Sequence, residues 1–444
     1  MKVLKFGGTS VGSAQRMKDV AKLICDGAQK VVVFSAMSGT TNSLVEISNY
    51  LYEKKHDAAN EIINRLSEKY ASVVNELYAT QEFKEKAHNH VRLHLNLIRS
   101  LVIDDFTSVE ERIILAQGEL MSTGMMDLYF HEIGVNTVIL PALDYMRTNN
   151  DKEPDTVFIK EKLLALMEKT PEVEFFITEG YICLNANDEI DNLQRGGSDY
   201  TASLVGAAIN AEEIQIWTDI DGMHNNDPRI VANTSPVRNL NFDEAAELAY
   251  FGAKILHPTC IQPAKLNNIP VRLLNTLQPE APGTTISNHL EKGKIKAVAA
   301  KDNITAIKIK SSHMLLATGF LRKVFEIFET YQTPIDMVTT SEVGISATID
   351  NPKNLDKIVD DLKKLGAVTV DKDMLIICVA GDLKWDNIGF EANIVNALKD
   401  IPIRMISYGG SNFNVSLLIK ASDKTRALQA LSEQLFNGEL RMEN

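Results

Sequence analysis

The spacing of apolar residues predicts alternating strands and helices in the first part of the chain. Apolar residues at positions 17, 20, 21 and 24 recur at helical spacing, and the run Val-Val-Val-Phe at 31–34 is typical of a strand buried on both faces. A first strand at 1–6 completes a strand–helix–strand unit. Further buried strands are predicted at 137–140, 174–177, 214–217 and 271–274. This alternation favours an α/β fold with a doubly wound, mainly parallel sheet.

A helical insertion is predicted from about residue 44 to 110. The segment is rich in Glu, Lys, Asn and His, has few glycines and keeps a long helical period. It forms either a solvated helical layer or a wall over a substrate pocket, and the solvated layer is the simpler interpretation.

The C-terminal part repeats its own pattern after a Pro- and Gly-containing hinge near 280–296. Pro-Ile-Asp-Met at 334–337 and Pro-Ile-Arg-Met at 402–405 each follow a helical segment and precede two strand-like runs and another helix. We therefore expect a first domain over 1–290 and two βαββαβ modules over 297–370 and 371–444.

Composition excludes several classes of protein. The 444 residues carry a formal net charge of −13, which disfavours general binding to nucleic acid or anionic membranes. No stretch approaches the ~18 apolar residues of a membrane span, and the N-terminus opens directly into a strand. Four scattered cysteines without a CxxC pair argue against a zinc site or a disulfide framework. We expect a cytoplasmic protein.

The segment Lys-Phe-Gly-Gly-Thr-Ser at 5–10 is the first candidate site. A strand delivers a lysine and two glycines onto an expected helix start, where backbone N–H groups and positive charge suit a phosphate. Because the lysine precedes the glycines, the segment matches neither GxxxxGK[ST] nor GxGxxG. Taken on its own, the segment fits an ordinary tight turn better than a phosphate site.

A second anion site is predicted at 195–201, Arg-Gly-Gly-Ser-Asp-Tyr-Thr, before a helix of small residues. Ser198 suits an N-cap, Asp199 gains from the helix dipole, and Arg195 can pair with a carboxylate through two hydrogen bonds. A capped helix after a simple turn is the alternative.

Acidic residues mark two further segments. The strand at 214–217 releases Asp219 and Asp221 at its carboxyl end, where ligands bind in open α/β sheets, although Asx turns explain such residues about as often. Glu119 lies in an apolar, small-residue helix and is costly to bury unless it meets a cation such as an ammonium group. No HExxH or Ser/His/Asp order stands out, and the nine histidines show no metal-ligand spacing, so no protein-held metal is expected.

In this order the segments resemble the aspartate kinase family, whose members have the amino-acid-kinase fold and phosphorylate the side-chain carboxylate of aspartate. Six motifs carry the resemblance: KFGGTS at 5–10, SxxxGxTN at 35–42, GE at 118–119, RGGSDYTA at 195–202, TD with DPR at 218–219 and 227–229, and FGAKILHP at 251–258. Together they span the catalytic half.

The resemblance implies residue roles and a reaction. It implies phosphate contacts and catalysis at Lys5, Gly7, Gly8 and Lys254, and Asp199 would orient the two lysines. It implies that the substrate aspartate is contacted by Ser35, Thr41, Glu119 and Arg195. It implies that the nucleotide is contacted by Thr218, Asp219, His224, Arg229 and Ile255. His224 replaces an aromatic residue that is frequent in the family. ATP would react with Mg²⁺ held mainly by its own phosphates, and positioning with charge neutralisation would carry the catalysis. The product would be 4-phospho-L-aspartate, at the first step towards lysine, threonine and methionine. The alternatives are a kinase of the same fold acting on another carboxylate, or a catalytically silent amino-acid sensor.

The C-terminal repeat resembles the tandem ACT domains of the monofunctional, lysine-sensitive members. That resemblance implies a homodimer or higher homo-oligomer through these modules and feedback by an amino acid, with lysine as the expected effector. The implied effector residues are Met314, Gly319, Phe320, Leu321, Asp336, Thr340 and Ser341.

Overall fold

The computed structural model describes residues 1–193, 196–252, 257–314 and 318–436. Their contacts divide the chain into two compact units. The first comprises Met1–Met223 with Leu256–Asn288, and the second comprises His224–Ile255 with His289–Asn444. Within the described ranges, no helix is both long enough and apolar enough to cross a membrane.

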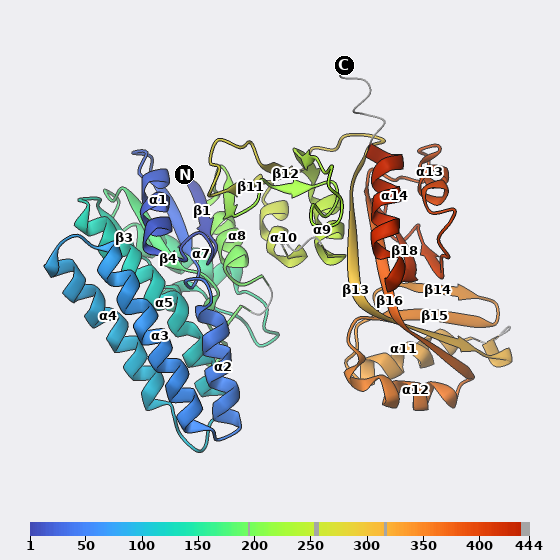
Figure 1. The fold of residues 1–444 in the computed structure, drawn as a ribbon, viewed down its shortest axis with the longest axis horizontal. Helices are drawn as coiled ribbons and strands as arrows, with labels where there is room; N and C mark the ends of the chain where they lie inside the picture. The colour runs from blue at the N-terminus through green and yellow to red at the C-terminus, as the bar shows by residue number, and fades with distance from the viewer. Residues whose placement is uncertain (194–195, 253–256, 315–317, 437–444) are drawn as a thin grey trace. The chain divides into compact units, whose positions relative to one another are not determined.

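The first unit is built on a largely parallel sheet (Figure 1). Its strands lie side by side in the order β12 (Thr284–Ser287), β11 (Val271–Asn275), β7 (Ile214–Thr218), β1 (Lys2–Phe6), β2 (Lys30–Phe34), β4 (Phe175–Glu179) and β3 (Thr137–Ile139). Each pair is parallel except β11–β12. The predicted doubly wound sheet is confirmed, and β2 is buried along its whole length, as its apolar run requires.

Helices cover the sheet as their apolar stripes dictate. The buried positions of α1 (Ala14–Ile24) include 17, 20, 21 and 24, which confirms the predicted helical stripe. Helix α8 (Gly197–Ile209) contacts β1, β2 and β7, and packs against α7 and α10. Further elements of this unit are α6 (Ala142–Tyr145), α7 (Thr156–Met167), α10 (Pro258–Leu266), β5 (Ile182–Leu184) and β6 (Ile190–Asn192).

The start predicted for α1 is wrong. The helix begins only at Ala14, with Ser13 as its N-cap, and the chain between Gly8 and Ser13 runs through turns, including a hydrogen bond from Ser10 N to Gly7 O. Gly7 and Gly8 therefore lie in a loop after β1 rather than at a helix N-terminus.

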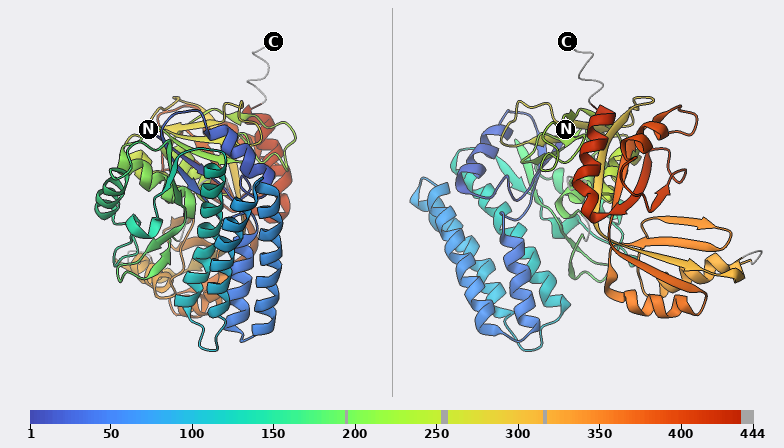
Figure 2. Two further views of the ribbon diagram at one scale, coloured as in Figure 1. Left: turned by 90° about the vertical axis from the view of Figure 1, so that its left-hand side faces the viewer. Right: turned by 45° about the vertical axis from the view of Figure 1, so that its right-hand side comes forward.

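The insertion consists of long helices that pack as neighbours (Figures 1 and 2). These are α2 (Thr40–Tyr52), α3 (His56–Leu77), α4 (Gln81–Ser100) and the following α5 (Ser108–Glu132). Their buried side chains, among them Leu44, Leu66 and Tyr70, belong to the same apolar core as Phe6 and Phe34 of the sheet. Helix α5 contacts β2, β3 and β4, so the helical layer packs against the part of the sheet that these neighbouring strands form.

The second unit contains an antiparallel sheet in the order β14 (Val338–Ser341), β15 (Gly344–Ile349), β13 (Ile295–Lys310), β16 (Ala367–Gly381), β18 (Asn414–Lys420) and β17 (Met405–Ser407). Helices α11 (Phe320–Thr330) and α12 (Leu355–Lys363) accompany one half, and α13 (Phe390–Ala397) and α14 (Lys424–Phe436) accompany the other. Each half has its own apolar core, so the predicted repeat of helix, two strands and helix is confirmed.

Two long strands run through both halves. Residues 304–310 of β13 pair with 367–374 of β16 in the first half, and 295–301 pair with 376–381 in the second. The register shifts between Lys301 and Ile304, and Asn303 and Asp373 there adopt left-handed backbone angles. The boundary expected between the two modules, at 370/371, falls inside β16. The domain boundaries stay a prediction.

Shorter elements complete the chain. Helix α9 (Phe242–Tyr250) starts with a capping box between Asn241 and Glu244 and packs against β13 and β16. The others are β8 (Met223–His224), β9 (Pro236–Val237), β10 (Asn239–Asn241) and the 3₁₀ turns Ser312–Met314, Pro352–Asn354 and Ala421–Asp423.

Tyr70→Phe is expected to lower the free energy of unfolding by about 1–2 kcal/mol, because it leaves the buried Thr40 hydroxyl without its partner. In the native chain the two hydroxyls lie 3.1 Å apart in the core, at the start of α2. The matched control is Tyr52→Phe, whose hydroxyl meets Glu111 at the surface and should cost under about 0.5 kcal/mol. Urea denaturation measures both, and equal losses would contradict the assignment.

Candidate active site

Loops from four parallel strands meet at the carboxyl edge of the first unit's sheet. Gly7 N donates to Trp217 O across 3.3 Å, Ser35 N to Phe6 O across 3.2 Å, and Gly180 N to Phe34 O across 2.9 Å. The loops after β1, β2, β4 and β7 are therefore joined laterally, which brings together segments that are distant in sequence.

Glycines allow this close approach. A Cβ at position 8 would lie 2.7 Å from the Ala36 carbonyl oxygen, and Ser38 N donates to Gly8 O across 3.1 Å. A Cβ at position 118 would lie 2.9 Å from Ala36 Cβ, and one at 180 would lie 2.4 Å from the Ser198 side chain. Only residues without a side chain fit these positions.

Lys5 and Asp199 form an ion pair at the centre of these loops. Lys5 Nζ lies 2.6 Å from Asp199 Oδ1, and both side chains are largely shielded from solvent. Asp199 lies in the first turn of α8, but the predicted N-cap is wrong: Gly196 caps the helix with φ +76°, and Ser198 is already helical. The Ser198 hydroxyl instead accepts a hydrogen bond from Ser35 Oγ across 2.8 Å.

Glu119 is buried beside this pair. It receives a hydrogen bond from the Ala36 backbone N–H, and burial raises its pKa to about 8, while the positive charge of Lys5 opposes that rise. Among the described residues, its Oε2 atom has no hydrogen-bond partner. With that pKa, Glu119 is largely protonated in the empty site at neutral pH, and a cation beside its free oxygen would favour the ionised carboxylate.

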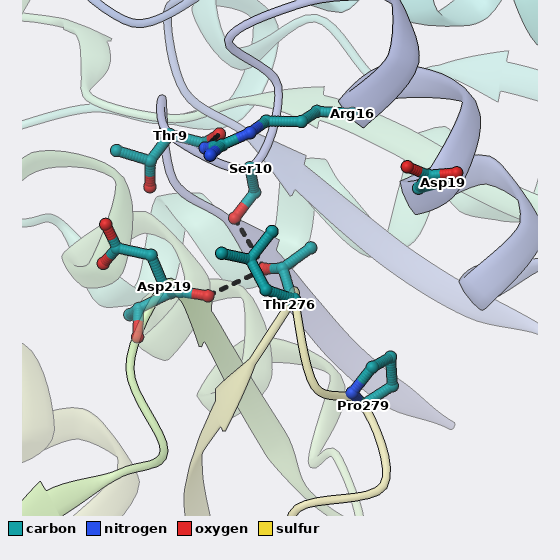
Figure 3. A pocket seen from close by; sticks show the side chains of 9 residues that line it. Thr9, Ser10, Arg16, Asp19, Asp219, Thr276 and Pro279 are labelled. Carbon is teal, nitrogen blue, oxygen red and sulfur yellow. Dashed lines mark hydrogen bonds between the residues drawn. The ribbon is translucent and has the colours of Figure 1, made fainter.

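A cavity of about 280 Å³ opens at the ends of β1, β7 and β11 (Figure 3). Its lining includes Thr9, Ser10 and Arg16 from the loop and helix after β1, together with Thr218 and Asp219. Ser10 Oγ lies 2.7 Å from Thr276 Oγ1, which donates to Thr218 O across 2.9 Å. Thr218 and Asp219, both predicted to contact nucleotide, thus border one cavity.

The other predicted site residues belong to other elements or lie outside the described residues. Arg195, Lys254 and Ile255 lie outside the described residues. Thr41 is exposed in the first turn of α2. His224 and Arg229 belong to the second unit, where Arg229 pairs with Asp227 and His224 Nδ1 lies 2.9 Å from Thr234 Oγ1.

The predicted effector residues lie in the first half of the antiparallel sheet. Gly319 caps α11 with φ +82°, Phe320 is buried, and Leu321 is exposed. Asp336 precedes β14 with a side chain only 2% exposed, and Thr340 and Ser341 end that strand. Met314 packs against the core of this half.

Several residues of the site were not predicted. Ser122 donates to Ser35 O across 2.7 Å, and Tyr181 N donates to Thr201 Oγ1 across 3.0 Å. Glu179 is fully buried at the end of β4, accepts a hydrogen bond from Ala142 N, and has a pKa raised by burial to about 7. Its place at the carboxyl end of a predicted strand was the one available signal. No group of three or more His, Cys, Asp or Glu side chains suited to a metal ion occurs in the described part of the chain.

Models of two known families match the two parts of the chain. Residues 1–275 match the model of the amino acid kinase family, and residues 377–435 match an ACT domain model. The fold and the site thus define a kinase of the amino acid kinase family.

Similarity to individual proteins shows which kinases of this family the chain resembles. The chain is 33% identical to aspartokinase 1, chloroplastic, of Arabidopsis thaliana, with 98% of this chain and 80% of that protein covered. It is 31% identical to lysine-sensitive aspartokinase 3 of Escherichia coli K12, with 98% and 99% covered. The crystal structure of E. coli aspartokinase III with aspartate and ADP superposes with a TM-score of 0.84 at 30% identity, covering 98% of this chain and 100% of that one. The chain belongs to the aspartokinases.

Glu179→Gln is expected to stabilise the free enzyme more at pH 8 than at pH 5, by roughly 2–3 kcal/mol. Because burial raises the pKa of this carboxyl from 4.5 to about 7, the native state holds its proton at pH 5, and the charge must be buried as pH rises through that window. Urea denaturation at the two pH values measures the difference. Glu174→Gln, an exposed residue just before β4, is the control and should show no such change; a pH-independent effect of Glu179→Gln would contradict the assignment.

Gly8→Ala is expected to reduce turnover by about a hundredfold or more, because the new methyl group would force the loops after β1 and β2 apart. Gly410→Ala is the control, since nothing lies within 4 Å of a Cβ there. Steady-state kinetics on both variants decides the point, and wild-type turnover in Gly8→Ala would show that the close approach is not needed.

Proposed function

We propose that this aspartokinase transfers the γ-phosphoryl group of ATP to the side-chain carboxylate of L-aspartate, in the site around Lys5, Asp199 and Glu119. The observation that supports the proposal most is the pairing of two buried features: a shielded lysine beside glycine loops, and a neighbouring carboxylate with a free oxygen. The first suits a phosphate, and the second suits the ammonium group of an amino acid.

The substrate amino acid would be held by opposite charges. Glu119 Oε2 would accept its α-ammonium group, and Arg195 would pair with its α-carboxylate, with Ser35 and Thr41 as further contacts. In this orientation the side-chain carboxylate is the free nucleophile, and it needs no general base because it is already ionised.

ATP would be bound by the loop after β1 and by the cavity beside it. The amides of Gly7 and Gly8 with Lys5 and Lys254 would neutralise the phosphates, while Thr218 and Asp219, with His224, Arg229 and Ile255, would hold the nucleoside. Asp199 orients Lys5, as the 2.6 Å ion pair supports. Mg²⁺ would add charge neutralisation at the phosphates; because Asp199 is engaged by Lys5, the residues fit an ion held mainly by the nucleotide.

Lysine is the proposed effector. E. coli aspartokinase III has been crystallised with lysine and aspartate, and this chain is 31% identical to it with a TM-score of 0.79. The effector would bind near Met314, Gly319, Phe320, Leu321, Asp336, Thr340 and Ser341. Association of two chains through the ACT-like sheet and a cytoplasmic location stay predictions.

A coupled assay of aspartate-dependent ADP formation tests the proposal. Turnover with aspartate and little with glutamate is the expected result; turnover with glutamate alone would favour another carboxylate kinase. A chain that binds lysine but forms no ADP would instead be an amino-acid sensor.

Glu119→Gln is expected to raise the KM for aspartate by about ten- to a hundredfold while leaving the KM for ATP within about threefold, because only the amino acid loses a charged partner. Glu111→Gln, on the same helix but at the surface, is the control. Equal changes in both KM values would argue that Glu119 acts on the loop rather than on the substrate. Lys5→Ala should abolish turnover and leave lysine binding intact.

A further inference from the structure

A second cluster of charged side chains, with Asp336 buried at its centre, lies outside the active site, within the second unit. Lys301 Nζ, on β13, is 2.6 Å from Asp336 Oδ1 and 2.9 Å from Asp350 Oδ2. The Tyr250 hydroxyl donates to the same Asp336 Oδ1 across 2.9 Å, and the Lys301 ammonium lies 4.4 Å from the centre of the Tyr250 ring. A cation over an aromatic face adds to the attraction.

The cluster has a surplus of negative charge. One ammonium group serves two carboxylates, and Asp336 Oδ2 is buried with no hydrogen-bond partner among the described residues. A carboxylate in this state gains from a second cation, since its remaining oxygen has lost water without compensation.

Tyr250 connects this cluster to a motif of the catalytic half. It is the last residue of α9, and Phe251 and Gly252 begin the segment Phe-Gly-Ala-Lys that ends at Lys254. Gly252 adopts φ +115°, and a Cβ there would lie 2.2 Å from the carbonyl oxygen of Ala300, the neighbour of Lys301. Gly252, two positions before Lys254 in the sequence, therefore lies against the strand that carries Lys301.

We propose that Tyr250 is a positioning residue through which occupancy of Asp336 controls the segment leading to Lys254. In the effector-free chain, Lys301 and the Tyr250 hydroxyl both bind Asp336 Oδ1, and the bond from Tyr250 fixes the end of α9. The ammonium group of an amino-acid effector at Asp336 weakens the bond to Tyr250, because the carboxylate then shares its charge with a further cation. The end of α9 is released, and turnover falls. This inference rests on the proposed function for the effector and for Lys254, and it adds the residue that links them.

Reciprocity makes the inference testable. If effector binding weakens the Tyr250–Asp336 bond, loss of that bond must strengthen effector binding by the same factor. Tyr250→Phe removes only the hydroxyl and keeps the ring beneath Lys301. We expect it to tighten lysine binding about ten- to a hundredfold, the effect of one hydrogen bond to a charged group. Turnover without lysine should fall.

Tyr331→Phe is the matched control. Its hydroxyl donates to Asp361 across 2.7 Å, so the variant removes the same kind of tyrosine–aspartate bond from the same half of the sheet without touching Asp336. Both its lysine affinity and its turnover should equal those of the unaltered enzyme.

Calorimetric titration with lysine and the ADP-formation assay are run in parallel on the full-length chain and both variants. Tighter lysine binding by Tyr250→Phe alone supports the inference; unchanged or weaker binding overturns it, as does an equal shift in Tyr331→Phe. Absence of aspartate-dependent turnover in the unaltered chain would contradict the proposed kinase activity, while the calorimetric comparison would still decide the role of Tyr250. Absence of lysine binding in an active enzyme would overturn this inference and the proposed effector, and leave the kinase activity standing.

Discussion

The cost of burying charge shapes this molecule. Lys5, Asp199 and Glu119 lie within one sheet edge where water is largely excluded, and each needs a partner there. Lys5 and Asp199 satisfy each other, and Glu119 has a backbone N–H on one side and an unpaired oxygen in the described structure. Leaving Glu119 Oε2 without a partner is energetically unfavourable in the empty enzyme. An ammonium group that binds there would supply the missing partner.

The loops at this edge of the sheet can hold Lys5, Asp199 and Glu119 together only because the loops lie in direct contact with one another. Gly8, Gly118 and Gly180 let backbone and small side chains meet at distances that any Cβ would prevent. The helical layer of α2 to α5 holds parts of the site in place. Helix α5 carries Gly118 and Glu119, and the start of α2 is hydrogen-bonded to Tyr70 of α3. The insertion thus shares the core of the sheet and shapes the site, beyond the solvated layer that its composition favoured.

In the second unit, too, charged side chains depend on their partners, but there the compensation is incomplete. Its sheet is continuous because β13 and β16 each serve both halves, and the change of partner occurs where the register shifts near Lys301. At that point Lys301, Asp336, Asp350 and Tyr250 neutralise one another incompletely. A carboxylate that is nearly but not fully satisfied can exchange partners at modest cost, which is the physical requirement of a regulatory contact.

The sequence by itself determined the periodicities and the motif residues. The continuous apolar run of β2 and the helical stripe of α1 reflect burial that depends on local spacing alone. Lys5, Asp199 and Glu119 could be selected because burying a charged side chain among glycines and apolar residues is costly unless it has a partner. Tertiary structure decided the rest. Local signals could not reveal that α1 starts only at Ala14 or that Gly196 rather than Ser198 caps α8. Nor could they reveal that Glu179 accepts a hydrogen bond from Ala142 N or that Tyr250 donates one to Asp336. Those features depend on which segments meet across the sheet, and the energy of such contacts is set by partners far away in the chain.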